Sequence, residues 1–347
     1  MRTLLAGLLG LSLLVAAPGP AAAERPGSSV WIPYWETPGA VTEVVRNGDV
    51  FAEASLFWYD ADCRRLHAST GAGDRGAVRR LRDAGLRPFV TVRAGGLPPR
   101  AAVRCLGDRG RRAAHVRMLV RLATSRGYAG LDLDYEQLAL TTDRALGRRV
   151  RAAFTALVSD LCPALRAVGR DCSVTVMPRW HERPVVWRGV LLPWVYDYEA
   201  LGASVDRLRV MAYDQHAGKG AGPVAGLPWV RRVARFAAAR VPGERVQLGV
   251  PTYGRDFTRR GSRSLVGAEA LRLARRHGVR PRWDARQAEL TFRYRTRGTW
   301  HRVWSSSPRS VAVRSRLARE LGLAGAAYWA AGLTAPGTWA AVRRRLR

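Results

Sequence analysis

The sequence contains almost no lysine. Of its 58 basic residues only Lys219 is a lysine, and the arginines leave a formal net charge of +31 over 347 residues. It also lacks a zinc-finger spacing, an RNP pattern and a basic helix with heptads, which excludes the common nucleic-acid-binding modules. A surface this basic favours polyanions, and outside a cell the candidates are anionic wall polymers, acidic glycans and lipid headgroups. Codon bias in a GC-rich genome is an alternative origin of the arginines.

Long apolar runs are absent beyond the N-terminus. Arg2, the apolar run from Leu4 to Ala17 and the small residues Ala21-Ala22-Ala23 predict a signal peptide over residues 1–23. The run is short for a membrane span, and an uncleaved N-terminal anchor is the competing interpretation. With the signal peptide, we expect a secreted, extracellular protein that associates with the cell wall.

Cysteine is scarce, and no CxxC pair or histidine spacing supports a zinc site. We therefore expect no metal and no cofactor. Four cysteines in an exported chain suggest two disulfides, for which three pairings exist. The short loop favours Cys162–Cys172, which leaves Cys63–Cys105. Among the histidines, only His216 follows a candidate site residue closely enough to line a cleft.

Strands alternate with helices along the chain, which predicts parallel βαβ units. Eight strands favour a closed (β/α)8 TIM barrel over residues 24–347, and a doubly wound sheet is the alternative, although no GxGxxG follows the first strand. The long connection between strands seven and eight predicts a small α+β insertion at about 258–306, with a hairpin that turns at Arg297-Gly298.

The expected strands are 30–35, 54–59, 87–93, 130–136, 173–177, 206–214, 245–253 and 325–329, and the expected helices are 76–84, 109–126, 142–158, 229–240 and, in the insertion, 266–276.

The stretch from Gly130 to Glu136 alternates acidic and apolar residues. Because successive side chains of a strand point to opposite faces, Asp132, Asp134 and Glu136 share one face. Crowded carboxylates tend to share protons, so one of them can stay protonated and act as a general acid. An edge strand with one wet face is the alternative interpretation.

Aromatic and charged residues collect at the predicted C-terminal ends of the strands, where barrel active sites form. Aromatic rings stack on sugar faces and carboxylates bind hydroxyls, so the group suggests a sugar site, although core packing is an alternative for each ring. The candidates are Trp35, Trp58, Tyr59, Glu136, Met211, Tyr213, Asp214, Tyr253, Arg255 and Trp329.

Four motifs in order resemble glycoside hydrolase family 18, the chitinase family. AGLDLDYE resembles the DGxDxDxE signature, RVMAYD the MxYD motif, LGVPTYGR the strand-seven motif and AAYW the terminal tryptophan strand. The segments YDYEALGASVDRLRVMAYD and GPVAGLPWV are most similar to the spore and cell-wall subgroup, which includes the YaaH-like N-acetylglucosaminidases. Two departures are Ala129 at the signature's first Asp and Tyr135 at a position where Trp is commoner.

The resemblance implies a role for each matched residue. Glu136 matches the general acid, Asp134 the residue that orients the substrate's N-acetyl group, and Asp132 its buried partner. Tyr213 matches the hydroxyl donor to the acetamide, with Met211 and Asp214 beside it, and Trp329 the floor under the reacting sugar. Such enzymes use the substrate's acetamide as nucleophile and retain configuration.

Three hypotheses follow. The first is a monomeric, secreted glycosidase that cleaves β-1,4 bonds after N-acetylglucosamine, with peptidoglycan as the leading substrate and chitin as the alternative. The second is a non-catalytic protein that binds a glycan or the cell wall through the same cleft. The third is a surface protein that binds polyanions through its charge of +31. None of the three requires nucleic acid or stable membrane insertion.

Overall fold

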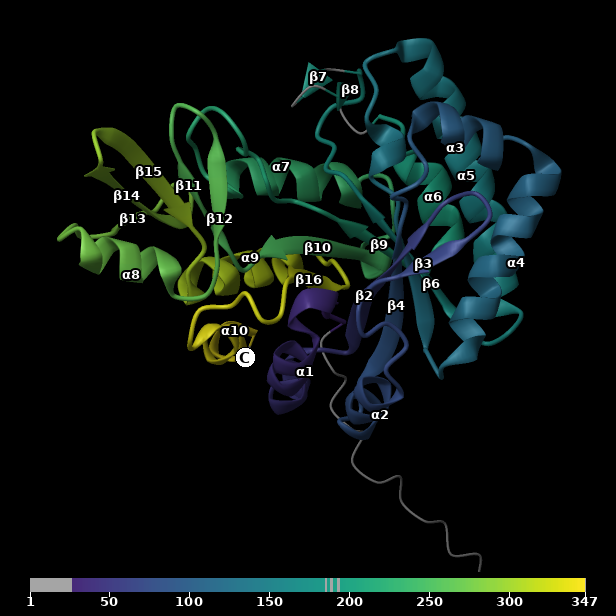
Figure 1. Ribbon diagram of the computed structural model, residues 1–347, viewed down its shortest axis with the longest axis horizontal. Helices are drawn as coiled ribbons and strands as arrows, with labels where there is room; N and C mark the ends of the chain where they lie inside the picture. Colours follow the sequence, from purple (N-terminus) through teal and green to yellow (C-terminus); the bar gives the residue numbers. More distant parts are fainter. Residues whose placement is uncertain (1–26, 185, 188–189, 192–193, 347) are drawn as a thin grey trace, which may run out of the picture.

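The protein is a closed eight-stranded parallel barrel. The computed structural model describes residues 27–346 except 185, 188–189 and 192–193, so the predicted signal peptide lies outside the described residues. Figure 1 shows the barrel strands with helices around them and a lobe of further strands beside them. In sheet order the barrel strands are β1 (Ser29–Pro33), β16 (Gly325–Trp329), β10 (Val246–Pro251), β9 (Arg207–Val210), β6 (Asp171–Val176), β5 (Gly130–Asp134), β4 (Arg87–Arg93) and β2 (Glu53–Ala61).

Pairing between β1 and β2 closes the ring, with Ser29 opposite Glu53 and Pro33 opposite Phe57. The predicted (β/α)8 barrel is therefore confirmed, and the alternative of an open doubly wound sheet is wrong. The acid-bearing strand β5 pairs with β4 on one side and β6 on the other, so it is not an edge strand.

The helices cover the outside of the barrel with their apolar faces. In α5, for example, Phe154, Leu157 and Leu161 are fully or almost fully buried. Within the described part of the chain, no helix is both long enough and apolar enough to cross a bilayer. The barrel helices are α1 (Thr37–Arg46), α2 (Arg75–Asp83), α3 (Pro99–Leu106), α4 (Arg109–Ser125), α5 (Arg144–Arg166), α6 (Tyr198–Ser204), α7 (Leu227–Ala238), α9 (Pro308–Glu320) and α10 (Thr338–Leu346).

A small α+β insertion separates β10 from α9 and β16, as the sequence predicts. It consists of a five-stranded antiparallel sheet in the order β12-β11-β15-β14-β13 and one helix. Figure 1 shows it as the lobe on the left of the barrel. Its elements are β11 (Gly254–Phe257), β12 (Ser262–Leu265), α8 (Glu269–Arg276), β13 (Arg282–Asp284), β14 (Glu289–Thr296) and β15 (Thr299–Ser305). The sheet therefore starts just before the predicted boundary at 258.

Short elements complete the fold. Strand β3 (Leu66–Ala68) pairs antiparallel with β2, and β7 (Val186–Trp187) pairs with β8 (Val190–Leu191). Among the described residues, 3-10 turns lie at Tyr34–Glu36, Gly48–Val50, Gln137–Ala139 and Gly243–Arg245.

Two disulfides join the four cysteines, Cys63 to Cys105 and Cys162 to Cys172. The favoured pairing is thus confirmed. The second disulfide fastens the end of α5 to β6, the strand beside β5.

Candidate active site

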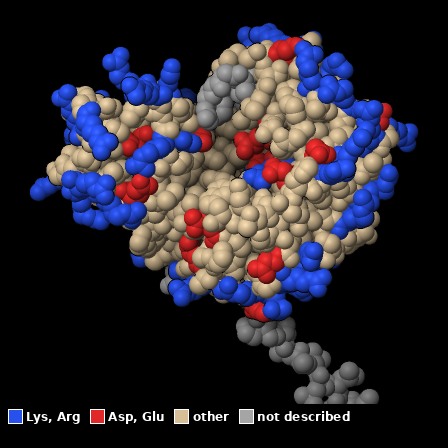
Figure 2. All heavy atoms as spheres, viewed as in Figure 1, with Lys and Arg blue, Asp and Glu red and all other residues tan. Residues whose placement is uncertain are grey.

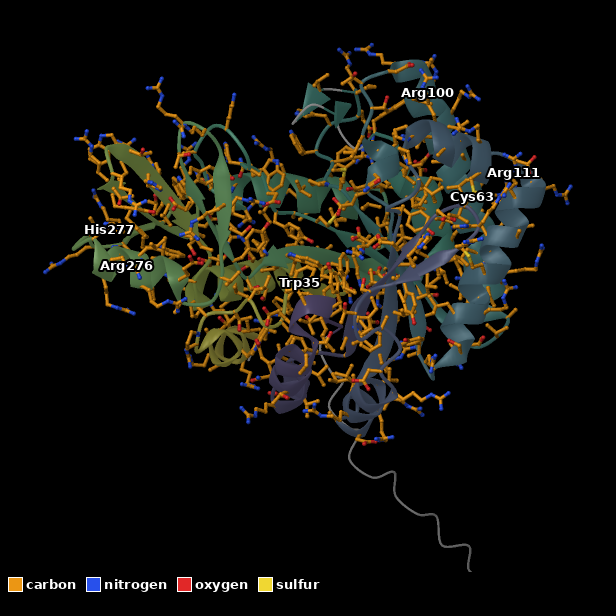
Figure 3. All side chains as sticks on the ribbon, in the orientation of Figure 1. Trp35, Cys63, Arg100, Arg111, Arg276 and His277 are labelled. Carbon is orange, nitrogen blue, oxygen red and sulfur yellow. A yellow bond between two sulfur atoms is a disulfide. The ribbon has the colours of Figure 1, made fainter. Side chains whose placement is uncertain are left out.

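A cleft of about 540 Å³ opens at the carboxyl ends of the barrel strands. Figure 3 shows Trp35 in the centre of the view, between the barrel and the insertion, and this residue is 50% exposed. Nine of the predicted site residues line the cleft: Trp35, Asp134, Glu136, Met211, Tyr213, Asp214, Tyr253, Arg255 and Trp329. The structure therefore brings together residues that are separated by almost three hundred positions.

Asp132 lies inside the barrel and is fully buried. Its Oδ2 accepts hydrogen bonds from Trp31 Nε1 at 3.1 Å and Thr91 Oγ1 at 3.1 Å, and Arg209 Nη1 lies 3.2 Å away. Its Oδ1 accepts from the hydroxyls of Ser173 at 2.8 Å and Thr175 at 3.0 Å. Both carboxylate oxygens of Asp132 are therefore enclosed by donors, and two of these groups, the indole and the guanidinium, can only donate.

Asp134 is one step closer to the cleft on the same face of β5 and is 5% exposed. Burial raises its pKa well above the ordinary value, and the neighbouring charges of Glu136 and Asp132 raise it further, while Arg93 acts in the opposite direction. Asp134 Oδ1 is buried without a hydrogen-bond partner among the described residues. Glu136 follows the end of β5 and is half-buried in the cleft wall. The pair can therefore hold a proton beside a bound substrate.

Asp214 is fixed by two neighbours. The guanidinium of Arg255 donates to both of its oxygens, at 2.8 and 2.7 Å, and Tyr253 Oη donates to Oδ1 at 2.6 Å. Asp214 has a φ of 55°, so the chain turns sharply after β9 and presents Tyr213 and Asp214 to the cleft. Burial raises the pKa of Tyr213 and of Tyr253, which keeps both hydroxyls protonated as donors.

Trp329 ends β16 and forms one wall of the cleft. Three rings meet it edge-on, with centroid distances of 4.8 Å to Phe57, 5.8 Å to Trp31 and 6.4 Å to Trp35. Thr252 fixes the backbone beside it, because Thr252 Oγ1 accepts from Ala330 N at 2.8 Å. The result is an aromatic surface on which a sugar face can stack.

Trp58 is not part of the cleft, and its assignment to the substrate site is wrong. It is fully buried, and its Nε1 donates to Thr37 Oγ1 at 3.2 Å. Phe57, its neighbour in β2, faces the cleft instead. The reason is the alternation of side chains along the strand, which sends one ring to the barrel interior and the next toward the helices.

A buried ion pair that the motifs do not indicate lies beneath the site. Arg209 is fully buried, with Nη2 2.8 Å from Glu53 Oε2 and Nε donating to Gln247 Oε1 at 2.9 Å. Its position in RLRV, between Leu208 and Val210, carries the signal, because a charged residue at an inward position of a barrel strand needs a partner. Arg93, the last residue of β4, also lines the cleft and pairs with Asp60.

His216 does not line the cleft. Its Nδ1 lies 2.9 Å from the carbonyl oxygen of Pro223, so the ring fixes the loop after β9. Across the described ranges, no group of three or more histidine, cysteine or acidic side chains is arranged to hold a metal ion.

The family model of glycosyl hydrolases family 18 matches residues 103–333. Among curated proteins, the chain is 29% identical to the putative sporulation-specific glycosylase YdhD of Bacillus subtilis, over 77% of this chain and 63% of that one. It is 28% identical to the cortical fragment-lytic enzyme of Bacillus anthracis, over 64% of this chain and 50% of that one. The chain thus spans less than two thirds of the length of these relatives.

Among solved structures, the chitinase of Chromobacterium violaceum superposes with a TM-score of 0.81 and is 26% identical. The match covers 92% of this chain and 98% of that one.

Proposed function

This chain belongs to glycosyl hydrolases family 18, and we propose that it is a secreted, retaining glycosidase that hydrolyses β-1,4 bonds after N-acetylglucosamine. The observation that carries the proposal is the arrangement of the three acids. Asp132 is enclosed by donors, Asp134 is buried with a raised pKa, and Glu136 borders the cleft.

Glu136 is the general acid. Its proton goes to the glycosidic oxygen as the bond to the anomeric carbon breaks. The negative surroundings of Glu136 and Asp134 favour a retained proton between them, which supports this assignment.

No protein carboxylate attacks the sugar in this mechanism. The oxygen of the substrate's 2-acetamido group bonds to the anomeric carbon as the leaving group departs, which gives an oxazolinium ion. Asp134 orients the acetamide, and the protonated hydroxyl of Tyr213 donates to it. Water then attacks the anomeric carbon, Glu136 takes up its proton, and the configuration is retained.

Trp329 stacks under the reacting sugar, and Trp35 contacts the next one. Met211 lines the cleft together with Tyr213. Asp214, held by Tyr253 and Arg255, accepts from a sugar hydroxyl or acetamide. These residues act as binding groups, so their loss raises KM more than it lowers kcat.

Peptidoglycan is the proposed substrate. Two similar proteins are described as a sporulation-specific glycosylase and a cortical fragment-lytic enzyme, and the net charge of +31 suits an anionic cell wall. Chitin is the second candidate, because the chitinase of Chromobacterium violaceum matches along almost its whole length. The protein acts outside the cytoplasm, as a monomer, in either case.

Product analysis by mass spectrometry tests the proposal. The mature protein and its Glu136→Gln variant are incubated with bacterial peptidoglycan and with chitin oligosaccharides. We expect new fragments that end in reducing N-acetylglucosamine from peptidoglycan, and a loss of at least about a hundredfold in rate with the variant. Cleavage of chitin alone would identify chitin, and not peptidoglycan, as the substrate. Saturable binding of either glycan with no new reducing ends would identify a binding protein instead.

A further inference from the structure

One face of the insertion sheet carries arginines. The opposite face packs on α8, because Phe292, Tyr294 and Val303 form a buried cluster with Leu273 and Ala274 of that helix. Since side chains alternate along a strand, the residues between them point away from α8. We call this second surface the arginine face, and it carries Arg282, Thr291, Arg293, Arg295, Trp300, Arg302 and Trp304.

Two of these arginines stand directly opposite each other. Arg293 on β14 is the register partner of Arg302 on β15. Like charges at facing positions destabilise a pair of strands. Neither guanidinium forms an ion pair with an acid of the described residues. The arrangement therefore carries a repulsion that a bound anion would remove.

Three buried hydrogen-bonding groups lie on this face without a partner in the described structure. They are Thr291 Oγ1, Arg302 Nε and Trp304 Nε1. Trp304 is only 5% exposed and packs against Tyr253 and Phe257, so of the three groups those of Thr291 and Arg302 are the ones that a ligand can reach. Buried polar groups are normally hydrogen-bonded, and all three of these can donate. What the face lacks is an acceptor, such as the oxygen of an anion.

Two hollows, of about 430 and 500 Å³, lie beside the arginine pair. Arg293 and Arg302 line both of them. Trp300, which is 62% exposed, lines the larger hollow together with Arg259. Asp284 is the single acid among the described residues that line either hollow, and its Oδ1 already accepts from Gln287 N. An extended anionic ligand has space here.

The charge of the insertion is predominantly positive. Residues 258–306 contain 13 arginines and three acids, a net +10 of the total +31. Two of the acids are engaged with arginines, Glu269 with Arg263 and Glu289 with Arg314. Figure 2 shows basic side chains gathered over this lobe, with acidic side chains visible both among them and near the central hollow. The insertion is therefore the part of the molecule where an anion would meet a net positive charge of +10.

We propose that the arginine face is a second binding site, separate from the catalytic cleft, for an anionic polysaccharide. Its phosphate or carboxylate oxygens accept hydrogen bonds from Thr291, Arg293 and Arg302, and its sugar rings stack on Trp300. The inference goes beyond the proposed hydrolysis and does not depend on it.

Binding measurements with the mature protein test the site. The probes are polyribitol phosphate teichoic acid, polygalacturonate, neutral dextran and single-stranded DNA of similar length. We expect the teichoic acid or the uronate polymer to bind, and we expect dextran not to bind. Comparison of the two anionic polymers shows whether phosphate or carboxylate groups are recognised. Arg293→Gln with Arg302→Gln should weaken binding about tenfold or more and reduce its dependence on salt. Trp300→Ala should also weaken it.

The matched control is Arg100→Gln with Arg111→Gln, two exposed arginines on the other side of the molecule (Figure 3). It removes the same charge and should change affinity less than twofold. An equal loss in this control, no loss in the double variant at 293 and 302, or tighter binding of DNA than of both polysaccharides would overturn the proposal.

Thermal stability gives a second, independent result. Arg293→Thr relieves the facing charges, so it should raise the unfolding temperature of the free protein while reducing the stabilisation by the polymer. An arginine pair with a purely structural role would lose stability in this variant. Because the readouts are binding and unfolding, they stay informative even if no glycosidase activity is found.

Discussion

Asp132 and Asp134 are two residues apart on one strand face and have different environments. Asp132 is surrounded by donors, whereas Asp134 has one buried oxygen without a partner and acidic neighbours. The alternation in the sequence predicts that both point inward. It does not predict Arg209, the cation beside Asp132, because β9 comes two strands away from β5 in the sheet and this order is not visible in the sequence.

Asp134→Asn should make the protein more stable at neutral pH. The folded-state pKa of Asp134 is raised, so above pH 4 the unfolded chain releases this proton while the folded protein keeps it, and stability falls as pH rises. Because asparagine cannot ionise, the variant does not lose stability in this way as pH rises. The gain is about 1.4 kcal/mol for each unit by which the pKa is raised.

Calorimetric unfolding from pH 3 to pH 8 measures this effect. The difference between variant and wild type should vanish below about pH 4, where both states are protonated. Asp83→Asn, at an exposed acid of α2, is the control. A variant that is less stable than the wild type at pH 7 would contradict the raised pKa.

Substitutions of Phe57 and of Trp58 should have different effects on KM and on stability. Phe57→Ala removes a ring that packs 4.8 Å from Trp329 at the cleft, so KM should rise roughly threefold to tenfold. Trp58→Phe removes a buried hydrogen bond to Thr37 and should cost about 1–3 kcal/mol of stability with KM unchanged. Steady-state kinetics and denaturant unfolding separate the two, and a raised KM in Trp58→Phe alone would reverse the assignment.

At the scale of elements, the sequence predicts β4 and β16 with the bounds that the structure has, because both are short apolar runs closed by a turn. It predicts β9 too long, since Met211 to Asp214 leave the strand in tight turns that the apolar pattern does not reveal. It misses α9, because Arg314 stands on the buried face of that helix and interrupts its apolar stripe.

The two disulfides should contribute unequally to the free energy of unfolding. The loop-entropy relation gives about 2.7 kcal/mol for Cys162–Cys172, with a separation of 10, and about 3.9 kcal/mol for Cys63–Cys105, with a separation of 42. Replacing each pair by serine and measuring the free energy of unfolding in urea tests the order. A larger loss from the shorter loop would show that strain or packing around α5 and β6 outweighs loop entropy.

At the scale of the whole molecule, the charge of +31 opposes folding through self-repulsion. Raising the ionic strength from about 0.01 to 0.15 M shortens the screening distance from about 30 to about 8 Å. The unfolding temperature should therefore rise by a few degrees with NaCl, measured by calorimetry at constant pH. A fall would mean that ion pairs such as Arg343–Asp49 matter more than the net repulsion.

The architecture follows from the sequence because eight strand–helix alternations leave few other topologies. The contribution of the insertion to the cleft wall does not follow from the sequence. Ser264 and Val266 line it from the insertion, and Leu333 lines it from beyond β16. These are ordinary small or apolar residues, and only the three-dimensional path of the chain brings them to the site.

The closure of the barrel also constrains its synthesis. Strand β16 pairs with both β1 and β10, and it follows both of them in the sequence. The ring therefore cannot close until β16 has been synthesised, and until then β1 and β10 each keep one open sheet edge. An unclosed barrel of this kind can pair through those edges with another chain, which the closed ring cannot do.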